Sequence, residues 1–509
     1  MFVLAVLLWH PVAHAASFLV SNTNDAGNGS LRNAITNANG AQGTNTILIT
    51  ATGTINLLSP LPAVSFTLAI AGPGADQLTI RRSTGAFPVL TINGTVQLSR
   101  VTIKDGDGGA GNGGGIVVQA GSLVLLDSTI TANSASLGSA IYSNGVLTIQ
   151  RSTISSNTGT GAIYGADTTN VIDSTIAGNQ GTAIVFFPTT ATKTLTIDRS
   201  TVSGNTDAGG IGGLQLQGGT ASIRNTTFSG NSGPQGGDFW TYSDGVTLSL
   251  VNVTAVGNSA PALLFDHNAT VTLRNTLLSG TGTRCSLGSQ PTSQGHNLSS
   301  DTTCNLIDAT DKPGIDPMLG PLGANGGATK THALLAGSPA ANAGDGTGLE
   351  ALDQRGMPRI QFSEVDIGAL EVTEPMITSQ PLQQELVEGD AITLTVAAMN
   401  QNSATPLRFQ WRKDDVPITG ATSDMFMKPE AQVEDSGMYD VLVINEGGNL
   451  VSVKVAVNVV PALKGDGNPG SGGGCCSANG PGMGSNAIFG LLLAVFLGIP
   501  RRPSSRRQR

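Results

Sequence analysis

Short apolar runs recur at a regular spacing along the first half of the chain. Six copies of one pattern, of which Asp127-Ser-Thr-Ile-Thr-Ala-Asn133 is typical, each end in Asn. The closing residues are Asn133, Asn157, Asn179, Asn205, Asn231 and Asn258, which are 24, 22, 26, 26 and 27 residues apart. A repeat of this length is typical of a solenoid, in which each repeat is one stacked unit.

Each repeat holds three apolar patches separated by Gly, Ser and Asn residues: one in the pattern itself, one before it and one after it. Three short strands and three turns per repeat form one coil of a parallel β-helix. Strands of successive coils would lie about 4.8 Å apart, so their inward side chains would form columns. We expect one apolar column to contain Ile130, Ile154, Ile176, Val202 and Phe228. The Leu spacing of leucine-rich repeats is missing, which excludes that solenoid.

The Asn that closes each repeat is expected at the same turn of every coil. Asn tolerates a left-handed backbone, and its side-chain amide can bond the copies above and below it. We interpret the series as a structural ladder. A ligand-binding row of amides on the surface is the alternative.

Residues 374–460 show a different pattern, with strand-like runs at 391–396, 407–411, 439–444 and 451–457. Trp411 lies 15 residues after Val396, and an Asp-Ser-Gly-Met-Tyr sequence ending at Tyr439 precedes Val441. This arrangement resembles an immunoglobulin-like domain. The resemblance implies a β-sandwich with Trp411 and Tyr439 in its core. It places Val396 and Val441 where such domains usually carry a disulfide.

Two further segments resemble exported bacterial β-helix proteins. Gly29-Ser-Leu-Arg-Asn-Ala-Ile35 is similar to the C-S-L-R-E-A-I motif of such proteins, and it also predicts a short amphipathic helix that caps the solenoid. Within 285–373, several pieces resemble, in order, the closing region of choice-of-anchor surface proteins. These pieces are 293–298, 316–322, 325–327, 331–334, 337–340, 342–344, 353–356 and 366–369. This second resemblance implies a loop-rich segment that wraps the last coils.

Both ends of the sequence carry patterns of export and anchoring. An apolar run over residues 2–9 and a small-x-small site predict a signal peptide over 1–15, with a short buried strand as the alternative. Residues 461–486 form a Gly/Pro linker with Cys475 and Cys476, and residues 487–509 combine a short apolar helix with an Arg tail. The tail resembles myxobacterial sorting signals, which implies a sorting protease and membrane attachment at the cell surface. An ordinary tail anchor is the alternative.

Composition narrows the class of protein further. Only 12% of the residues are charged and 4% are aromatic, while 68 of 509 are Gly, which argues against helical bundles. The net charge of −9 argues against a nucleic-acid binder, which needs a basic face. Cys285 and Cys304 lie 19 residues apart in a chain expected to be exported, so we expect them to form a local disulfide.

Candidate catalytic residues are few. Asp105 and Asp107 form the best acidic pair, although a Gly-rich turn is the favoured explanation for them, and His267 follows an Asp. Glycoside hydrolysis needs paired carboxylates, and lyase chemistry needs a Ca²⁺ site and a base. The Asp and Arg residues that alternate at the start of the repeats are interpreted as ion pairs between coils. We expect no cofactor and no metal, with Ca²⁺ required only for a lyase.

These patterns predict an all-β protein, with a right-handed parallel β-helix over 16–284, its closing region over 285–373 and an immunoglobulin-like sandwich over 374–460. We expect a non-catalytic, surface-anchored module whose Ser, Thr and Asn side chains contact a glycan or a surface protein. A cell-bound polysaccharide lyase or glycoside hydrolase is the alternative, because such enzymes share the fold. Acids clustered with His and Arg on one face would favour the enzyme. A flat Ser/Thr/Asn face would favour the binding module.

Overall fold

The computed structural model describes most of residues 15–462, nearly all of them in strands and turns. Outside the description are residues 1–14, 42, 259–260, 266–267, 288–289, 336, 349, 360–364, 373–374, 401–405, 446–447 and 463–509. Most of the expected signal peptide, His267, Cys475, Cys476 and the apolar C-terminal run therefore lie outside the described residues. Within the described part, no helix is long and apolar enough to cross a membrane.

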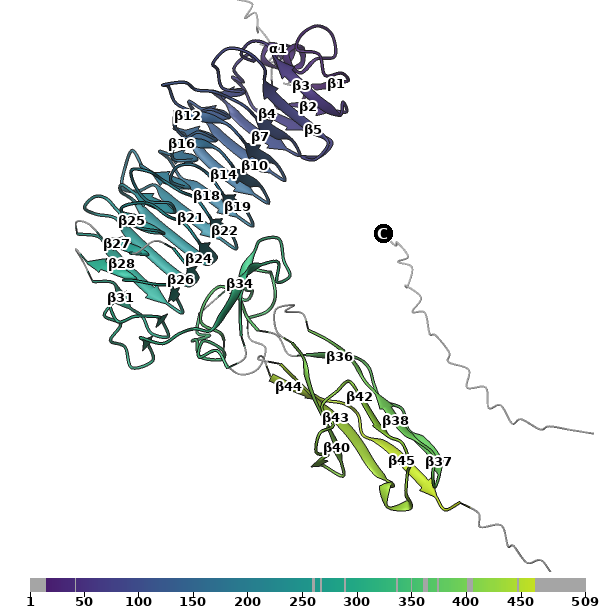
Figure 1. The fold of residues 1–509 in the computed structure, drawn as a ribbon. Helices are drawn as coiled ribbons and strands as arrows, with labels where there is room; N and C mark the ends of the chain where they lie inside the picture. Colours follow the sequence, from purple (N-terminus) through teal and green to yellow (C-terminus); the bar gives the residue numbers. More distant parts are fainter. Residues whose placement is uncertain are drawn as a thin grey trace, which may run out of the picture. The chain divides into compact units, whose positions relative to one another are not determined.

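Columns of short parallel strands form a solenoid (Figure 1), and two of these columns join in one 22-stranded sheet of the described residues. The first column contains β1 (Ser17–Val20), β2 (Asn45–Ile49), β4 (Leu68–Ala71), β7 (Thr95–Ser99), β10 (Ser122–Leu126), β14 (Val146–Gln150), β18 (Thr169–Ile172), β21 (Thr194–Asp198), β28 (Thr270–Arg274) and β31 (Thr292–Ser293). The second contains β3 (Gly53–Leu57), β5 (Leu78–Arg82), β8 (Thr102–Lys104), β11 (Thr129–Thr131), β15 (Thr153–Ser155), β19 (Thr175–Ala177), β22 (Thr201–Ser203), β29 (Leu277–Ser279), β32 (Leu298–Ser299) and β33 (Lys312–Pro313). Two long strands, β24 (Thr220–Ser229) and β26 (Thr247–Val256), run through both columns.

The third column is a separate parallel sheet on another side of the coil. It contains β6 (Leu90–Ile92), β9 (Ile116–Val118), β13 (Ile141–Ser143), β17 (Ile163–Gly165), β20 (Ile184–Phe186), β23 (Leu214–Leu216), β25 (Phe239–Thr241), β27 (Leu263–Phe265) and β30 (Cys285–Leu287). A short parallel pair, β12 (Ser134–Leu137) and β16 (Thr158–Thr160), bridges two coils beside it.

The register of the second column explains why the repeat folds in this way. Ile130 pairs with Ile154, and the column continues through Ile176 and Val202 to Phe228. All five side chains are at most 1% exposed. Each coil thus buries its alternate apolar residues against the same residues of the next coil, and the predicted parallel β-helix is confirmed.

Helix α1 (Leu31–Gly40) lies over the N-terminal end of the solenoid (Figure 1). The Ser30 hydroxyl accepts a hydrogen bond from the Asn33 N–H at 3.3 Å and so caps the first turn. One face of the helix, formed by Leu31, Ala34, Ile35 and Ala38, is buried. These apolar side chains keep water from the inner columns of the first coils.

The turns differ from the expectation in one respect. The left-handed residue is not the repeated Asn but the residue before it, for example Ala132 with φ 55° and Ser156 with φ 56°. A second left-handed position separates the first two strand columns in the coils from Arg100 to His296, for example at Asp127 with φ 48° and Arg151 with φ 47°. Because the preceding residue makes the bend, the Asn side chain itself points into the turn, where it meets its neighbour in the next coil.

Residues 319–372, which we call the cover segment, pack along the side of the last coils. The segment contains a hairpin of β34 (Leu319–Gly323) and β35 (Thr331–Leu334). Its Gln354 side chain bonds Thr227 at 2.6 Å and Thr201 at 3.1 Å, and the Ala369 N–H donates to Thr254 at 2.9 Å. These threonines are outward-facing residues of successive coils, so the segment covers the second column from Thr201 onward.

Residues 376–460 form a β-sandwich with a core of its own. One sheet contains β37 (Gln384–Val387), β45 (Val455–Val460), β43 (Gly437–Asn445), β40 (Arg408–Lys413), β41 (Val416–Pro417) and β44 (Gly448–Val451). The remaining strands pair as β36 (Met376–Ser379) with β39 (Ala397–Met399) and β38 (Ile392–Thr395) with β42 (Met425–Lys428). A short 3-10 turn, η1 (Val433–Asp435), precedes β43.

Two side chains give this sandwich its immunoglobulin-like character. Trp411 is fully buried and donates from Nε1 to the Ser423 carbonyl at 2.9 Å. The Tyr439 hydroxyl donates to the Asp435 carbonyl at 2.9 Å, which is the tyrosine corner of such domains. Val396 and Val441 are both buried in the same core.

The run predicted over 451–457 is divided between β44 and β45. Ser452 bonds Val441 through both its N–H and its hydroxyl, at 2.9 and 3.0 Å. These bonds hold the backbone at Ser452 out of a regular strand, so the two strands are separated there.

Candidate functional site

The repeated Asn residues form a hydrogen-bonded ladder inside the solenoid. Asn133 Nδ2 donates to Asn157 Oδ1 at 2.9 Å, and the next rungs, through Asn179 and Asn205 to Asn231, measure 3.0, 2.8 and 3.0 Å. Asn258 joins through its Oδ1, which accepts from the Asn231 backbone N–H. All six are buried, so their amides contact protein and not solvent. This geometry gives the series a structural use and leaves no amide row at the surface.

A second ladder runs beside the first and was not predicted. The Ser128 N–H donates to the Ser152 hydroxyl at 3.1 Å, and the same bond joins Ser152 to Ser174 and Ser174 to Ser200. These serines are buried directly after the left-handed residue that separates the two strand columns. The signal was present in the sequence, because each of these repeats has Ser at its second position.

Asp105 and Asp107 lie just after β8, and the protein's own arginines occupy them. Arg81 Nε is 2.8 Å from Asp105 Oδ2, and Arg82 Nη2 is 3.9 Å from Asp107 Oδ2. Asp107 Oδ1 also accepts from the Gly109 N–H at 2.8 Å, which fastens the Gly-rich turn. The pair therefore has the contacts of a structural turn, with an arginine of the preceding coil beside each carboxylate.

The structure brings together a serine and a histidine that lie 103 residues apart. His332 Nε2 is 2.9 Å from the Ser229 hydroxyl, and its Nδ1 is 2.7 Å from the Gly320 carbonyl. A carbonyl only accepts, so Nδ1 carries the proton and Nε2 accepts from Ser229. Burial lowers the pKa of His332. His332 is 7% exposed and Ser229 9%, so this pair fastens the cover segment to β24 and offers a substrate little access.

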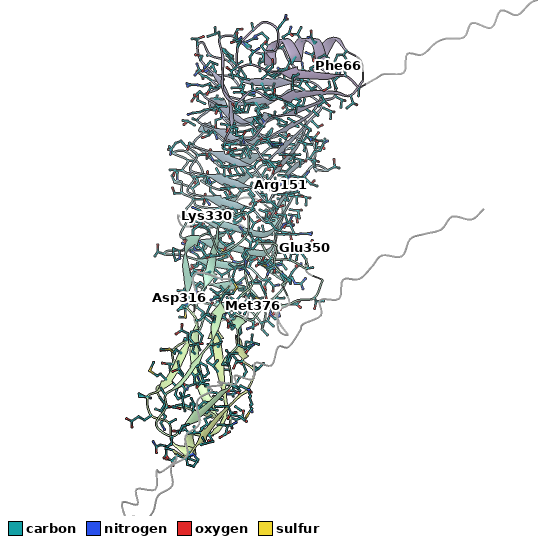
Figure 2. All side chains as sticks on the ribbon, turned by 90° about the vertical axis from the view of Figure 1, so that its right-hand side faces the viewer. Phe66, Arg151, Asp316, Lys330, Glu350 and Met376 are labelled. Atoms are coloured by element: carbon teal, nitrogen blue, oxygen red, sulfur yellow. A yellow bond between two sulfur atoms is a disulfide. The ribbon has the colours of Figure 1, made fainter. Side chains whose placement is uncertain are left out.

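Two Asp–Arg ion pairs join adjacent coils of the repeats. Asp127 binds Arg151 at 2.7 Å, and Asp173 binds Arg199 at 2.8 Å, in each case between adjacent coils. Figure 2 shows Arg151 at the surface of the solenoid. The Arg151 guanidinium lowers the pKa of Asp127, chiefly through their hydrogen bond. Among the described residues, no cluster of His, Cys, Asp and Glu could hold a metal ion.

What the described coils do present is a regular uncharged surface, which we call the threonine face. It comprises the outward residues of β11, β15 and β19, namely Thr129, Thr131, Thr153, Ser155, Thr175 and Ala177. Each pairs in register with its counterpart in the next coil, and each is partly exposed. The cover segment begins at the following coil, on Thr201, so the face ends there.

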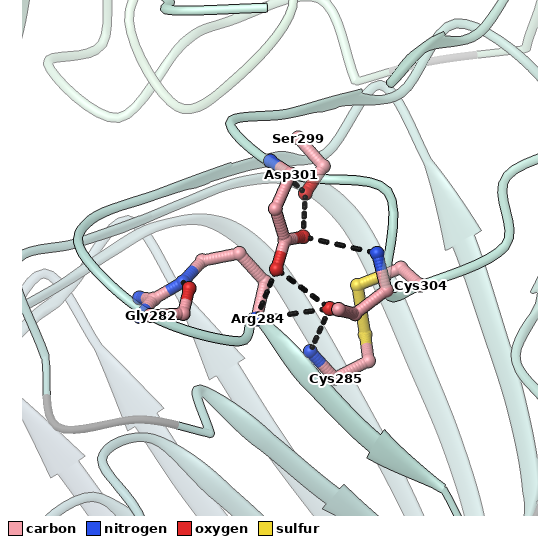
Figure 3. Close-up of a disulfide and its surroundings, with 7 residues drawn as sticks. Gly282, Arg284, Cys285, Ser299, Asp301 and Cys304 are labelled. Atoms are coloured by element: carbon pink, nitrogen blue, oxygen red, sulfur yellow. Dashed lines mark hydrogen bonds between the residues drawn. A yellow bond between two sulfur atoms is a disulfide. The ribbon is translucent and has the colours of Figure 1, made fainter. Parts of the chain in front are cut away.

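A disulfide joins the last strand of the third column to the turn beyond it (Figure 3), which confirms the expected pairing of Cys285 with Cys304. Asp301 organises this turn, because its carboxylate accepts from the Arg284 N–H at 2.8 Å and from the Thr303 hydroxyl at 2.7 Å. The Thr303 hydroxyl in turn accepts from the Cys285 N–H at 3.0 Å. The disulfide is therefore part of a local structural network.

Comparison with known proteins agrees with the solenoid. A family model described as "Right handed beta helix region" matches residues 89–252 and 138–304. The chain is also 34% identical over 94 residues to the decoration protein of Escherichia phage T5. That match covers 18% of this chain and 56% of the phage protein, so the chain spans about half the length of this relative.

Solved immunoglobulin domains are similar to a short part of the chain. Sidekick-1 immunoglobulin domains 1-5 are 31% identical over 17% of this chain and 18% of theirs, with a TM-score of 0.15. The N-terminal Ig1-2 module of the Drosophila receptor protein tyrosine phosphatase DLAR is 19% identical over 17% of this chain and 45% of its own, also with a TM-score of 0.15. The sandwich itself is defined by its strand pairing and its tyrosine corner. The chain is a right-handed parallel β-helix protein with a C-terminal immunoglobulin-like β-sandwich.

Proposed function

We propose that this protein is an exported, surface-anchored module without catalytic activity, and that its threonine face contacts a glycan or protein surface. The observation that carries the proposal is the face itself: three coils of register-paired, uncharged residues on a rigid sheet, five of the six with a hydroxyl. Such a surface has evenly spaced hydrogen-bonding groups and loses little conformational freedom on binding. The short likeness to a phage decoration protein supports a structural surface role.

The contacts of the candidate acids favour this proposal over the enzyme. Glycoside hydrolysis requires two carboxylates free to act on either side of a glycosidic bond. Asp105 and Asp107 each lie against an arginine of a neighbouring strand, and Asp127 and Asp173 are held in the same way. Anchoring through the C-terminal tail and export through the N-terminal segment belong to the same proposal.

The proposal is tested with the full chain and surfaces of known composition. The wild-type chain is incubated with insoluble polysaccharides and with fixed bacterial cells, and retention after washing is measured. The double variant Thr153→Lys/Thr175→Lys, which puts two charges on the face, should lose most retention. Thr189→Lys, on an exposed turn outside the face, should retain it.

The same polysaccharides are then assayed for chain shortening, with and without Ca²⁺. Shortening that is lost in Asp105→Ala or Asp107→Ala would replace the proposal by the polysaccharide-cleaving enzyme. Equal retention of the wild type and the face variant would rule out the threonine face as the contact.

A further inference from the structure

A hollow of about 440 Å³ lies on the outer side of the third strand column, away from the threonine face. It extends over three successive coils, because Thr91 of β6, Val117 of β9 and Tyr142 of β13 are register partners on its floor. The residues that line it are Pro88, Thr91, Asn112, Val117, Gln119, Tyr142 and Asn144, and we call it the Tyr142 pocket. Its volume falls in the range of about 300 to 1,000 Å³ that is usual for small-ligand pockets.

One wall of the pocket is the face of an aromatic ring. Tyr142 stacks on Tyr164 of the next coil, with ring centroids 5.1 Å apart and planes 14° from parallel. Because one face of Tyr142 is used in this way, its other face points along the solenoid toward the coil of Val117. Val117, the register partner of Tyr142 in that coil, has a short side chain that is itself buried.

The other walls carry side-chain amides that have no hydrogen-bond partner among the described residues. Asn112, Gln119 and Asn144 are exposed, and within the described residues their side chains make no hydrogen bond. The turn at Asn112 packs closely against the sheet because the next residue is Gly113, which has a φ of +72°. A Cβ at Gly113 would lie only 2.3 Å from the Val117 side chain. The side-chain amides of these three residues can therefore donate hydrogen bonds to a ligand and accept them from it. None of the lining residues is charged.

We propose that the Tyr142 pocket binds a short segment of an uncharged glycan, with one sugar ring stacked on the free face of Tyr142. The electron-rich ring face attracts the C–H groups of a sugar's apolar side. Amides both donate and accept, which matches hydroxyl groups that do the same. No lining residue is a cation that could pair with an acidic glycan, so the pocket should select neutral sugars. This site is separate from the threonine face and does not depend on the proposed function.

The experiment measures binding of neutral and acidic oligosaccharides to the full chain by titration calorimetry. The probes are hexasaccharides of glucose, xylose, mannose and N-acetylglucosamine, with oligogalacturonate as the acidic counterpart. We expect at least one neutral probe to bind with Kd below about 1 mM, a range usual for weak single sites. We expect Tyr142→Ala to weaken it at least 10-fold. Oligogalacturonate should not bind in this pocket.

A second variant keeps the stack but fills the hollow. Asn144→Trp places a large ring in the hollow from an exposed lining residue whose side chain makes no hydrogen bond within the described residues, so the fold should be kept and binding abolished. Gln215→Ala, in the same outward column four coils further on from Val117, is the matched control. Circular dichroism of each variant verifies the fold.

Three results would overturn the pocket assignment. These are no binding of any neutral probe, equal binding by wild type and Asn144→Trp, or preference for the acidic probe that Tyr142→Ala leaves unchanged. Each of these leaves the threonine face to be judged by its own lysine variants, so the two proposals fail separately.

Discussion

Asn179 shows how one buried side chain stabilises neighbouring coils of the solenoid. Its Oδ1 accepts both the Nδ2 and the backbone N–H of Asn157, each at 3.0 Å, and its Nδ2 reaches Asn205 at 2.8 Å. The side chain thus satisfies a backbone donor of the coil before it. A buried donor without a partner costs about 1 to 3 kcal/mol.

We predict that Asn179→Ala lowers the free energy of unfolding by about 1 to 3 kcal/mol, because the Asn157 N–H is left without an acceptor. Denaturant unfolding followed by circular dichroism measures the change. Gln180→Ala, at the exposed neighbouring residue, should cost less than about 0.5 kcal/mol. An unchanged midpoint for Asn179→Ala would show that the ladder adds nothing to stability.

Asp238 is a buried acid that links stability to pH. Its Oδ1 accepts from Asn231 Nδ2 at 3.1 Å, while its Oδ2 has no partner among the described residues. Burial raises the pKa of Asp238 to about 8. Above the ordinary pKa of the unfolded chain, the folded protein keeps a proton that the unfolded chain has lost. Stability therefore falls as the pH rises.

We predict that the free energy of unfolding decreases between about pH 4 and about pH 8, by at least about 1.4 kcal/mol from this residue. Asp238→Asn keeps an acceptor for Asn231 and should flatten the dependence. The measurement is the melting temperature at a series of pH values, with the exposed Asp76→Asn as the control. An equally steep dependence in Asp238→Asn would assign the effect to other groups.

At the scale of the elements, the strands were predictable and the side-chain contacts of the cover segment were not. Strand positions follow from apolar residues such as Ile130 and Ile154, which have to face the core of any coil. The contacts of Gln354 with Thr201 and Thr227 join residues more than 120 apart in sequence, with no local pattern to reveal them. The Ser229–His332 pair was missed for the same reason.

The cover segment depends on a buried cation. The Arg359 guanidinium donates to Asn225 Oδ1 at 2.7 and 3.1 Å and lies 3.6 Å from the Glu371 carboxylate. Burial raises the pKa of Glu371 and so does the nearby Asp366 charge, whereas Arg359 opposes the shift. Without the Arg359 guanidinium, the buried side chains of Asn225 and Glu371 lose the cation that they contact.

We predict that Arg359→Leu destabilises the protein by about 3 to 5 kcal/mol, as breaking a buried pair does. Limited proteolysis should then cut first within residues 319–372. Arg224→Leu removes a surface ion pair with Glu350, and it should cost less than about 1 kcal/mol. Equal protease resistance of Arg359→Leu and the wild type would contradict this account of the segment.

The disulfide is an element-scale clamp on the last coils. It closes a loop of 19 residues, for which the chain-entropy model gives about 3 kcal/mol. We predict that Cys285→Ser/Cys304→Ser lowers the stability by about this amount, measured by thermal unfolding. Reductant should lower the stability of the wild-type protein to the level of the double variant, and it should leave the stability of the double variant unchanged. A reductant effect on the double variant would point to another thiol.

At the scale of the whole molecule, the sandwich and the solenoid have separate apolar cores. The sandwich core contains Trp411, Tyr439 and Val441, and the solenoid core ends at Leu306. A unit with its own core can fold alone. We predict that residues 375–462 unfold cooperatively as an isolated fragment, followed by Trp411 fluorescence in urea.

In that fragment, Tyr439→Phe should cost about 1 kcal/mol, because only the hydrogen bond to the Asp435 carbonyl is lost. A fragment that shows no cooperative transition would mean that the sandwich depends on the rest of the chain.

The sequence by itself determined the fold class, because a repeat of apolar residues every 22 to 27 positions can bury its faces only by stacking on itself. It also determined the disulfide, since its two cysteines are close in the chain. Tertiary structure decided the surfaces. Which hydroxyl column the cover segment hides, and that Tyr142 stacks on Tyr164 with Val117 on its other side, depend on which coils become neighbours. The sequence pattern places inward apolar residues in columns, but it does not show which outward side chains of different coils or of the cover segment meet.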